Sequence, residues 1–285
     1  MTDINDQVFN GIRKTINRFR EKPFHYFTEA DIHSSLLNDI MSGGKGIVTK
    51  RTNNISISLV HQEYPTNYRY MKKKLLKGYD CKTDYKETSL NSKKGDRGNF
   101  DLAILNPEFV KTVIGDDIEK SMHHLISKDA KDAIERNKRN DKAFQEEILF
   151  AIEVKFIHYR NARNKSMIEE IIKDNEKLLL AIAHSDSFIK PINLIFCTSG
   201  AKKRRDKKTS VIEKVKSYVT GEIIQLYDSE TKYHSSADVL TIFVESFIDE
   251  QQKKTEKPTT NFDNTNSKLD WAKLLIEKLK ISNTS

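Results

Sequence analysis

The sequence contains few cysteines and no long hydrophobic run. Cys81 and Cys197 are the only two cysteines among 285 residues, and they lie far apart in the chain. They predict neither a disulfide framework nor a CxxC metal site, and Cys197, inside an apolar run, is expected to be a buried thiol. No segment approaches the roughly 18 apolar residues of a membrane span, and the first residues lack the pattern of a signal peptide. We therefore expect a cytoplasmic protein without a membrane partner.

Charge, by contrast, is abundant and unevenly distributed. The formal net charge is +8, and charged residues make up 32% of the chain. The segment from Arg69 to Arg97 holds ten Lys or Arg against four acids, and Lys202 to Lys216 holds eight against two. Clustered positive charge attracts polyanions because it neutralises phosphates and releases counterions. Nucleic acid is the first candidate partner and an acidic membrane surface the second, while solvated basic faces explain the charge equally well.

Hydrophobic periodicity predicts alternating helices and strands. The expected helices cover residues 4–20, 28–42, 166–184, 209–219 and 237–250, and the expected strands cover 55–60, 100–105, 148–156, 191–198 and 222–228. Thr28 is expected to N-cap the second helix, with Asp31 as its capping partner three residues later. This order of elements favours an α/β layered domain with a central mixed sheet flanked by helices.

The domain boundaries follow from changes in composition. We expect one domain over residues 1–250, with an exposed helical insertion at about 116–146, where the sequence is strongly polar. Residues 251–267 lack periodicity and are interpreted as a linker. Residues 268–281 form a short amphipathic C-terminal helix, and its Trp271 face is expected to dock on its own domain or on a second copy.

Glu153 and Lys155 carry the strongest chemical signal in the sequence. They are two residues apart in an apolar strand, so their side chains leave the same face. Asp101 lies one residue inside another apolar strand. Buried charges are costly unless they are paired or bind a metal. Two strands that each offer a carboxylate at similar depth can hold a divalent cation, and oxygen ligands with retained water suit magnesium, for which manganese can substitute.

This set of residues suits phosphodiester hydrolysis. A magnesium ion held by Asp101, Glu153 and the carbonyl of Val154 would bind a phosphate oxygen and a water, and Lys155 would orient that water and offset charge on the phosphate. Two simpler interpretations remain open. A Glu-x-Lys pair in a strand is commonly a surface ion pair, and Asp101 is also explained as the start of a strand after a turn.

Asp101 followed by Glu153-Val-Lys155, each in an apolar strand, resembles the signature of the PD-(D/E)XK nuclease superfamily. The segments 61–66 and 98–105 are similar to segments of its restriction-like members, and the resemblance covers roughly residues 28–198. It implies a restriction-endonuclease-like core with a four-stranded mixed sheet and metal-dependent cleavage of DNA, less often RNA. This chain departs from the pattern at Phe100, where the family has proline, and in the wide gap between Asp101 and Glu153.

Two further acids compete for the remaining role in this site. By the resemblance, Glu29 at the first turn of its helix would bind a second metal or orient Lys155, although the helix dipole alone also favours an acid there. Glu63 ends the first expected strand, in phase with Ile55, Ile57 and Leu59. It is expected either to reach the metal or its water, or to sit at a solvated strand end.

Basic side chains near these elements are candidates for phosphate contacts, although each is also explained as a solvated face. The set comprises Lys93, Lys94, Arg97, Lys173, Lys177, Lys202, Lys203, Arg204 and Arg205. The sequence therefore predicts a magnesium-dependent endonuclease acting on DNA in restriction or mobile-element defence. The alternative is a catalytically inactive nuclease-fold protein that serves as a DNA-binding or assembly module. Because restriction-like enzymes often pair two active sites, a homodimer is also expected.

Overall fold

The structure is a computed structural model that describes residues 4–43, 48–50, 56–66, 69–72, 85–88, 98–108, 146–158, 165–184, 189–200, 222–226, 239–248 and 270–281. Four α-helices are described, with a 3₁₀ turn η1 (Pro23–His25): α1 (Ile4–Glu21), α2 (Glu29–Met41), α7 (Lys165–His184) and α9 (Asp270–Ile281). The described strands are β1 (Val48–Lys50), β2 (Ser56–Ser58), β3 (Val60–Pro65), β4 (Arg69–Lys72), β5 (Tyr85–Thr88), β6 (Asn99–Leu105), β7 (Ile148–Ile157), β8 (Lys190–Gly200), β9 (Glu222–Leu226) and β10 (Leu240–Ile248).

The architecture is α/β with a mixed sheet, as expected from the order of elements. The described strands of the main sheet follow the hydrogen-bonded order β3-β6-β7-β8-β10-β9. β3 pairs with β6 antiparallel, whereas β10 lies parallel to both β8 and β9. β1 with β2 and β4 with β5 form separate antiparallel pairs.

The chain divides into two compact units, and β7 and α7 each contribute to both. The first unit comprises residues 1–46, 152–175 and 191–285, and therefore holds α1, α2, α9 and the strands β8, β9 and β10. The second comprises residues 47–151 and 176–190, and holds β3 and β6.

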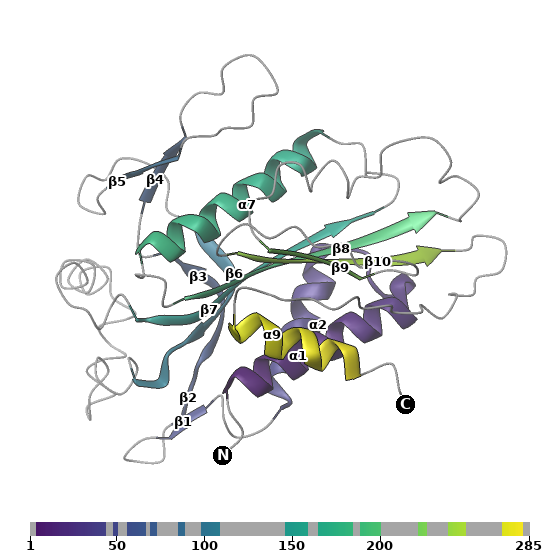
Figure 1. Cartoon of the computed structure of the whole chain (residues 1–285), viewed down its shortest axis with the longest axis horizontal. Coiled ribbons are helices and arrows are strands. Elements are labelled where there is room, and N and C mark those ends of the chain that lie inside the picture. Colours follow the sequence, from purple (N-terminus) through teal and green to yellow (C-terminus); the bar gives the residue numbers. More distant parts are fainter. Residues whose placement is uncertain are drawn as a thin grey trace. The chain divides into compact units, whose positions relative to one another are not determined.

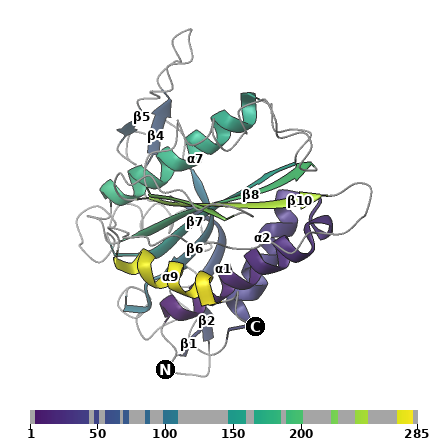
Figure 2. The same cartoon turned by 45° about the vertical axis from the view of Figure 1, so that its right-hand side comes forward.

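In the first unit, helices cover both faces of the strands (Figure 1; Figure 2). On one face, the Phe19 ring of α1 lies 5.0 Å from the Phe196 ring and 6.1 Å from the Phe156 ring. On the other, Ile171 of α7 packs in a buried cluster with side chains from three strands, namely Ile157, Ile195, Cys197 and Phe243. Even-numbered residues of β7 and β8 therefore face α1, and odd-numbered ones face α7. Cys197 is a buried thiol, as the sequence predicts.

Two expected elements need correction. Residues 237–250 were expected to be helical, but Leu240–Ile248 is strand β10, which lies between β8 and β9. Because residues 239–244 are buried on both faces, they form an apolar run with no alternation, which periodicity alone does not distinguish from a buried helix. The expected strand at 55–60 is also wrong in extent: β2 pairs with β1, and a new strand begins at Val60 and pairs with β6.

The other described elements confirm the expected helices near 4–20, 28–42 and 166–184 and the strands near 100–105, 148–156, 191–198 and 222–228. The insertion at 116–146, the linker at 251–267 and the helix at 209–219 lie outside the described residues. α9 packs on its own chain: Lys278 Nζ lies 2.7 Å from Asp6 Oδ1 of α1. Within the described part of the chain, no helix combines the length and apolar character needed to cross a membrane.

α1 and α2 cross closely at Gly11. A Cβ atom at this position would lie 2.5 Å from Ile40 Cγ1 and 2.8 Å from Ile40 Cα. A polar network ties the same two helices together, because Arg18 donates to Asp39 at 2.7 Å and Thr15 donates to the other Asp39 oxygen at 2.8 Å. This crossing fixes α2, which carries Glu29, against α1.

Replacement of Gly11 by alanine tests this close approach. Alanine favours a helix over glycine by about 1 kcal/mol. The contact with the Ile40 backbone should nevertheless outweigh that gain, because backbone does not move aside as a side chain does. We expect Gly11→Ala to lower the free energy of unfolding by about 1–3 kcal/mol in urea titration. The control Lys14→Ala, at an exposed position of α1, should stay within about 0.5 kcal/mol of the native chain. An unchanged or raised free energy of unfolding for Gly11→Ala would contradict the close approach of Gly11 to Ile40.

Candidate functional site

Lys155 is the centre of a charged cluster in the first unit. Its Nζ lies 3.3 Å from Glu29 Oε1, 3.5 Å from Asp174 Oδ2 and 3.6 Å from Glu170 Oε2. The Lys155 side chain is 13% exposed and that of Asp174 15%, whereas the Glu170 side chain is 59% exposed. One largely buried ammonium group therefore has three carboxylate neighbours, which come from α2 and α7.

The start of α2 positions Glu29. Thr28 is the N-cap: its hydroxyl accepts the Asp31 N–H at 3.3 Å, and Asp31 Oδ2 accepts the Thr28 N–H at 2.8 Å, which forms the capping box expected from the sequence. Asp31 Oδ2 also accepts the Phe27 N–H at 2.8 Å, and these backbone donors lower the pKa of Asp31. Glu29 is thereby the first helical residue, and its Oε2 accepts the Phe156 N–H of β7 at 3.2 Å.

The helical spacing of α7 brings the other two carboxylates to Lys155. Glu170 and Asp174 are four residues apart, so they lie on the same side of the helix. Ile171, beside Glu170, is fully buried in the cluster beneath α7 and anchors this turn on the strands. α7 therefore holds both carboxylates in a fixed relation to β7.

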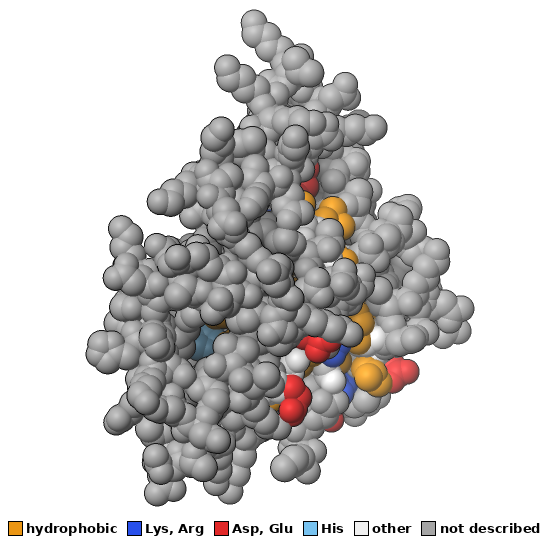
Figure 3. Space-filling model, turned by 90° about the vertical axis from the view of Figure 1, so that its left-hand side faces the viewer, with side chains coloured by type: hydrophobic (Ala, Val, Ile, Leu, Met, Phe, Trp, Pro, Cys, Tyr) orange, Lys and Arg blue, Asp and Glu red, His pale blue; other side chains and the backbone are white. Residues whose placement is uncertain are grey.

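The carboxylates determine the charge state of Lys155. Burial disfavours the ammonium form, but the negative charges of Asp174, Glu29 and Glu170 outweigh that desolvation, so the pKa of Lys155 is raised above its ordinary value of 10.5. Lys155 therefore carries a positive charge across the whole physiological pH range. Figure 3 shows acidic and basic side chains side by side on the face that it draws.

Glu153 lies two residues before Lys155 on the same face of β7. It is 1% exposed in a strand that is buried along most of its length. A carboxyl group at that depth is a costly feature of a strand core, as the sequence predicts.

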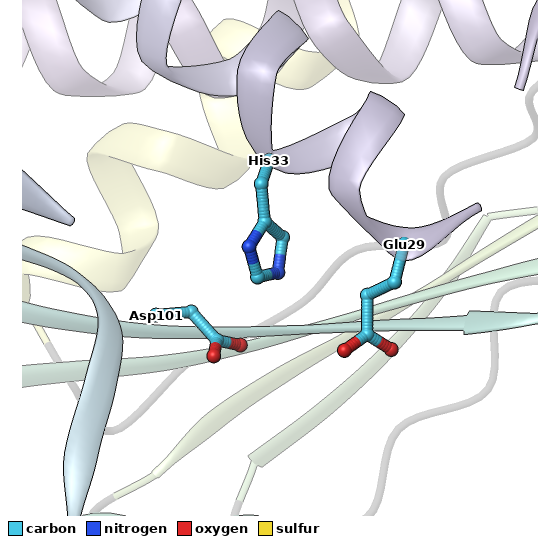
Figure 4. A group of neighbouring side chains, drawn as sticks. All are labelled: Glu29, His33 and Asp101. Carbon is cyan, nitrogen blue, oxygen red and sulfur yellow. The ribbon is translucent and has the colours of Figure 1, made fainter. Parts of the chain in front are cut away.

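His33 was missed by the sequence analysis. It lies on α2 four residues after Glu29, so both side chains leave the same side of the helix (Figure 4). A ring nitrogen of His33 and a carboxylate oxygen of Glu29 lie within 4.8 Å of each other, which is close enough for both to bind one metal ion. The i, i+4 spacing from Glu29 is the signal that would have identified it.

Asp101, also drawn in Figure 4, belongs to β6 in the second unit and is half-buried. Gln62 pairs with Leu102 and Tyr64 with Phe100, so Glu63 of β3 lies across from Asp101 in the register. Glu63 does not keep the expected phase, however, because its φ of 49° is left-handed. Its side chain is exposed, and its Oε2 accepts a hydrogen bond from Asn99 Nδ2 at 3.5 Å.

Two of the candidate phosphate-binding residues are described. Lys173 is exposed on α7. Lys177 donates a hydrogen bond to the backbone oxygen of Asn99 at 2.7 Å, so it ties α7 to the start of β6 within the second unit. The remaining candidates lie outside the described residues: Lys93, Lys94, Arg97, Lys202, Lys203, Arg204 and Arg205.

The comparisons with known proteins identify no family. No protein-family model, no curated protein and no solved structure matches the chain. The function must therefore be argued from the site itself.

A second titratable group lies in the second unit around His61. The Tyr64 hydroxyl donates to Glu147, which is 2% exposed, and the His61 and Tyr64 rings lie 5.6 Å apart. Burial lowers the pKa of His61 below its ordinary value of 6.5, although the Ser58 backbone and the charge of Glu147 act in the opposite direction. His61 is therefore neutral at pH 7.

This lowered pKa predicts a pH dependence of stability. Below about pH 6.5 an unfolded chain binds a proton at His61 that the folded chain resists, so the free energy of unfolding should decrease as the pH falls from about 6.5 through the lower folded pKa. His61→Gln should remove this part of the decrease in urea titrations between pH 5 and pH 8. The control His25→Gln, at an exposed position, should keep it. A native-like decrease in His61→Gln would show that other groups cause it.

Proposed function

We propose that the chain is a metal-dependent nuclease with a restriction-endonuclease-like core, which hydrolyses DNA phosphodiester bonds with magnesium or manganese. The observation that carries this proposal is the pair Glu153 and Lys155 on one face of β7, with the Lys155 ammonium held by Glu29 from α2. This arrangement agrees with the resemblance of Asp101 and Glu153-Val-Lys155 to PD-(D/E)XK nucleases.

The charges of the first unit fit a divalent cation. Glu29, Glu170 and Asp174 set three carboxylates against one ammonium group, which is a formal excess of two negative charges. Such a site repels a phosphate unless a cation neutralises it, so the reaction should depend strictly on metal. Carboxylate oxygens are also the ligands that magnesium and manganese prefer. A bound divalent cation supplies Lewis-acid polarisation of a phosphate oxygen and of the attacking water.

Under this proposal Lys155 is a charged group rather than a general base. Because its pKa is raised, its ammonium donates hydrogen bonds and does not accept a proton at neutral pH. It would orient the attacking water through the lone pairs of the water oxygen. It would also stabilise the negative charge that develops on the phosphate in the transition state.

The remaining roles follow from the depth and identity of the acids. Glu153, at 1% exposure, would ligate the cation together with the Val154 carbonyl, and the resemblance implies the role of a further carboxylate ligand for Asp101. Glu29 would be the third carboxylate, with His33 beside it on α2. Glu63 would act on the cation or its water only through rearrangement, because its carboxylate is exposed and contacts Asn99.

Cleavage of plasmid DNA tests the proposal. The native chain with magnesium or manganese should nick or linearise plasmid, and chelation should abolish this. Lys155→Met and Asp101→Asn should each lower the cleavage rate by about 100-fold or more, because each removes a charge required in the transition state. Parallel reactions with single-stranded DNA and RNA define the preferred nucleic acid.

The matched control is Lys278→Met, which removes another paired lysine of the first unit and should cleave at the native rate. Native-rate cleavage by both Lys155→Met and Asp101→Asn would exclude the assigned site. If the native chain binds DNA in a salt-sensitive way but cleaves no nucleic acid with either metal, the DNA-binding or assembly module is the correct function.

A further inference from the structure

In the proposed reaction, Glu170 and Asp174 of α7 contribute negative charge around Lys155 but are neither ligands nor catalytic groups. We propose that Glu170 and Asp174 are positioning residues that hold the Lys155 ammonium in place when Glu29 exchanges Lys155 for a divalent cation. This inference rests on the cation of the proposed function and assigns a task to two residues of this chain that the sequence analysis did not single out.

The first step concerns the two oxygens of Glu29. Oε1 lies 3.3 Å from Lys155 Nζ, and Oε2 accepts the Phe156 N–H at 3.2 Å. A divalent cation bound to Glu29 repels the Lys155 ammonium, whereas it has no net charge to repel at the Phe156 amide. Oε1 is therefore the oxygen that changes partner, while Oε2 keeps the carboxylate attached to β7.

A second observation indicates where such a cation would lie. His33 offers a ring nitrogen within 4.8 Å of a Glu29 carboxylate oxygen, on the same helix as Glu29. Lys155, by contrast, approaches Glu29 from β7. Glu29 is thus within reach of both an ammonium group and a potential metal ligand.

The second step concerns the fate of Lys155. A lysine that is 13% exposed and loses its carboxylate partner carries an uncompensated buried charge, which is strongly unfavourable. Asp174 and Glu170, at 3.5 and 3.6 Å, remain as partners after Glu29 departs. Asp174 should contribute more, because its side chain is 15% exposed whereas that of Glu170 is 59% exposed and screened by solvent.

The consequence is a coupling between α7 and cation binding. Without Asp174 and Glu170, the Lys155 ammonium depends on Glu29 alone. A cation that takes the Glu29 oxygen would then leave this ammonium without a carboxylate partner. Replacement of the two acids should therefore weaken cation binding through Lys155, beyond the general effect of two lost negative charges. In a chain without the Lys155 ammonium, only the general effect should remain.

A double-mutant cycle separates these two effects. The full chain is titrated with Mn²⁺ in the absence of nucleic acid by isothermal calorimetry at near-physiological salt, and Asp174→Asn/Glu170→Gln is compared in the native and Lys155→Met backgrounds. We expect about tenfold weaker Mn²⁺ binding in the native background, with a loss at least about threefold smaller in the Lys155→Met background. Asp174→Asn alone should account for most of the loss, and Asp174→Glu, which restores a carboxylate, should recover part of it.

The control for charge is Glu169→Gln, an exposed acid next to Glu170 that does not contribute to the raised pKa of Lys155. It should change Mn²⁺ affinity by less than about twofold, and thermal unfolding should show that each variant is folded. An equal loss in both backgrounds would overturn the positioning role, and the proposed nuclease function would stand if Glu29→Gln still weakens Mn²⁺ binding. If the native chain binds no Mn²⁺, both the proposed cation site and the positioning role are wrong.

Discussion

The structure depends on the compensation of one buried positive charge. Lys155 lies in an apolar strand, and its ammonium is largely removed from water. Three carboxylates within 3.6 Å satisfy it, one from α2 and two from α7. Because an unpaired charge at this depth is strongly destabilising, both helices must keep their positions relative to the end of β7. The hydrophobic contacts beneath α7 and the crossing of α1 with α2 provide that rigidity.

The same arrangement gives the site its chemistry. The ammonium is fixed and permanently charged, and the acids around it outnumber it. Glu153 adds a carboxylate that is buried two residues away on the same face. A group of this composition is suited to bind a divalent cation, whose charge would let an anionic substrate approach, as the proposed function needs. Glu29 joins α2 to this group, because one of its oxygens contacts the Lys155 side chain and the other accepts a hydrogen bond from the β7 backbone.

Local signals in the sequence predicted much of this arrangement, and tertiary contacts account for the rest. The capping box at Thr28 and the strand phase of Glu153 and Lys155 depend on neighbouring residues alone, so they could be predicted. Strand β10 could not be distinguished from a helix, because burial on both faces removes the alternation that marks a strand. Acids spaced as Glu170 and Asp174 are common on solvated helices, so nothing in the sequence indicated their contact with Lys155. The left-handed backbone of Glu63 likewise has no local sequence signal such as glycine.

The proposed function needs a metal site that includes the carboxylates around Lys155. A crystal structure of the chain soaked with Mn²⁺, with anomalous diffraction data, tests it most directly. We expect one strong anomalous peak at about 2.0–2.3 Å from carboxylate oxygens of Glu29 and Glu153, with Lys155 retained beside Asp174. The absence of such a peak at a concentration that saturates binding, or a peak that neither Glu29 nor Glu153 coordinates, would contradict the proposed function.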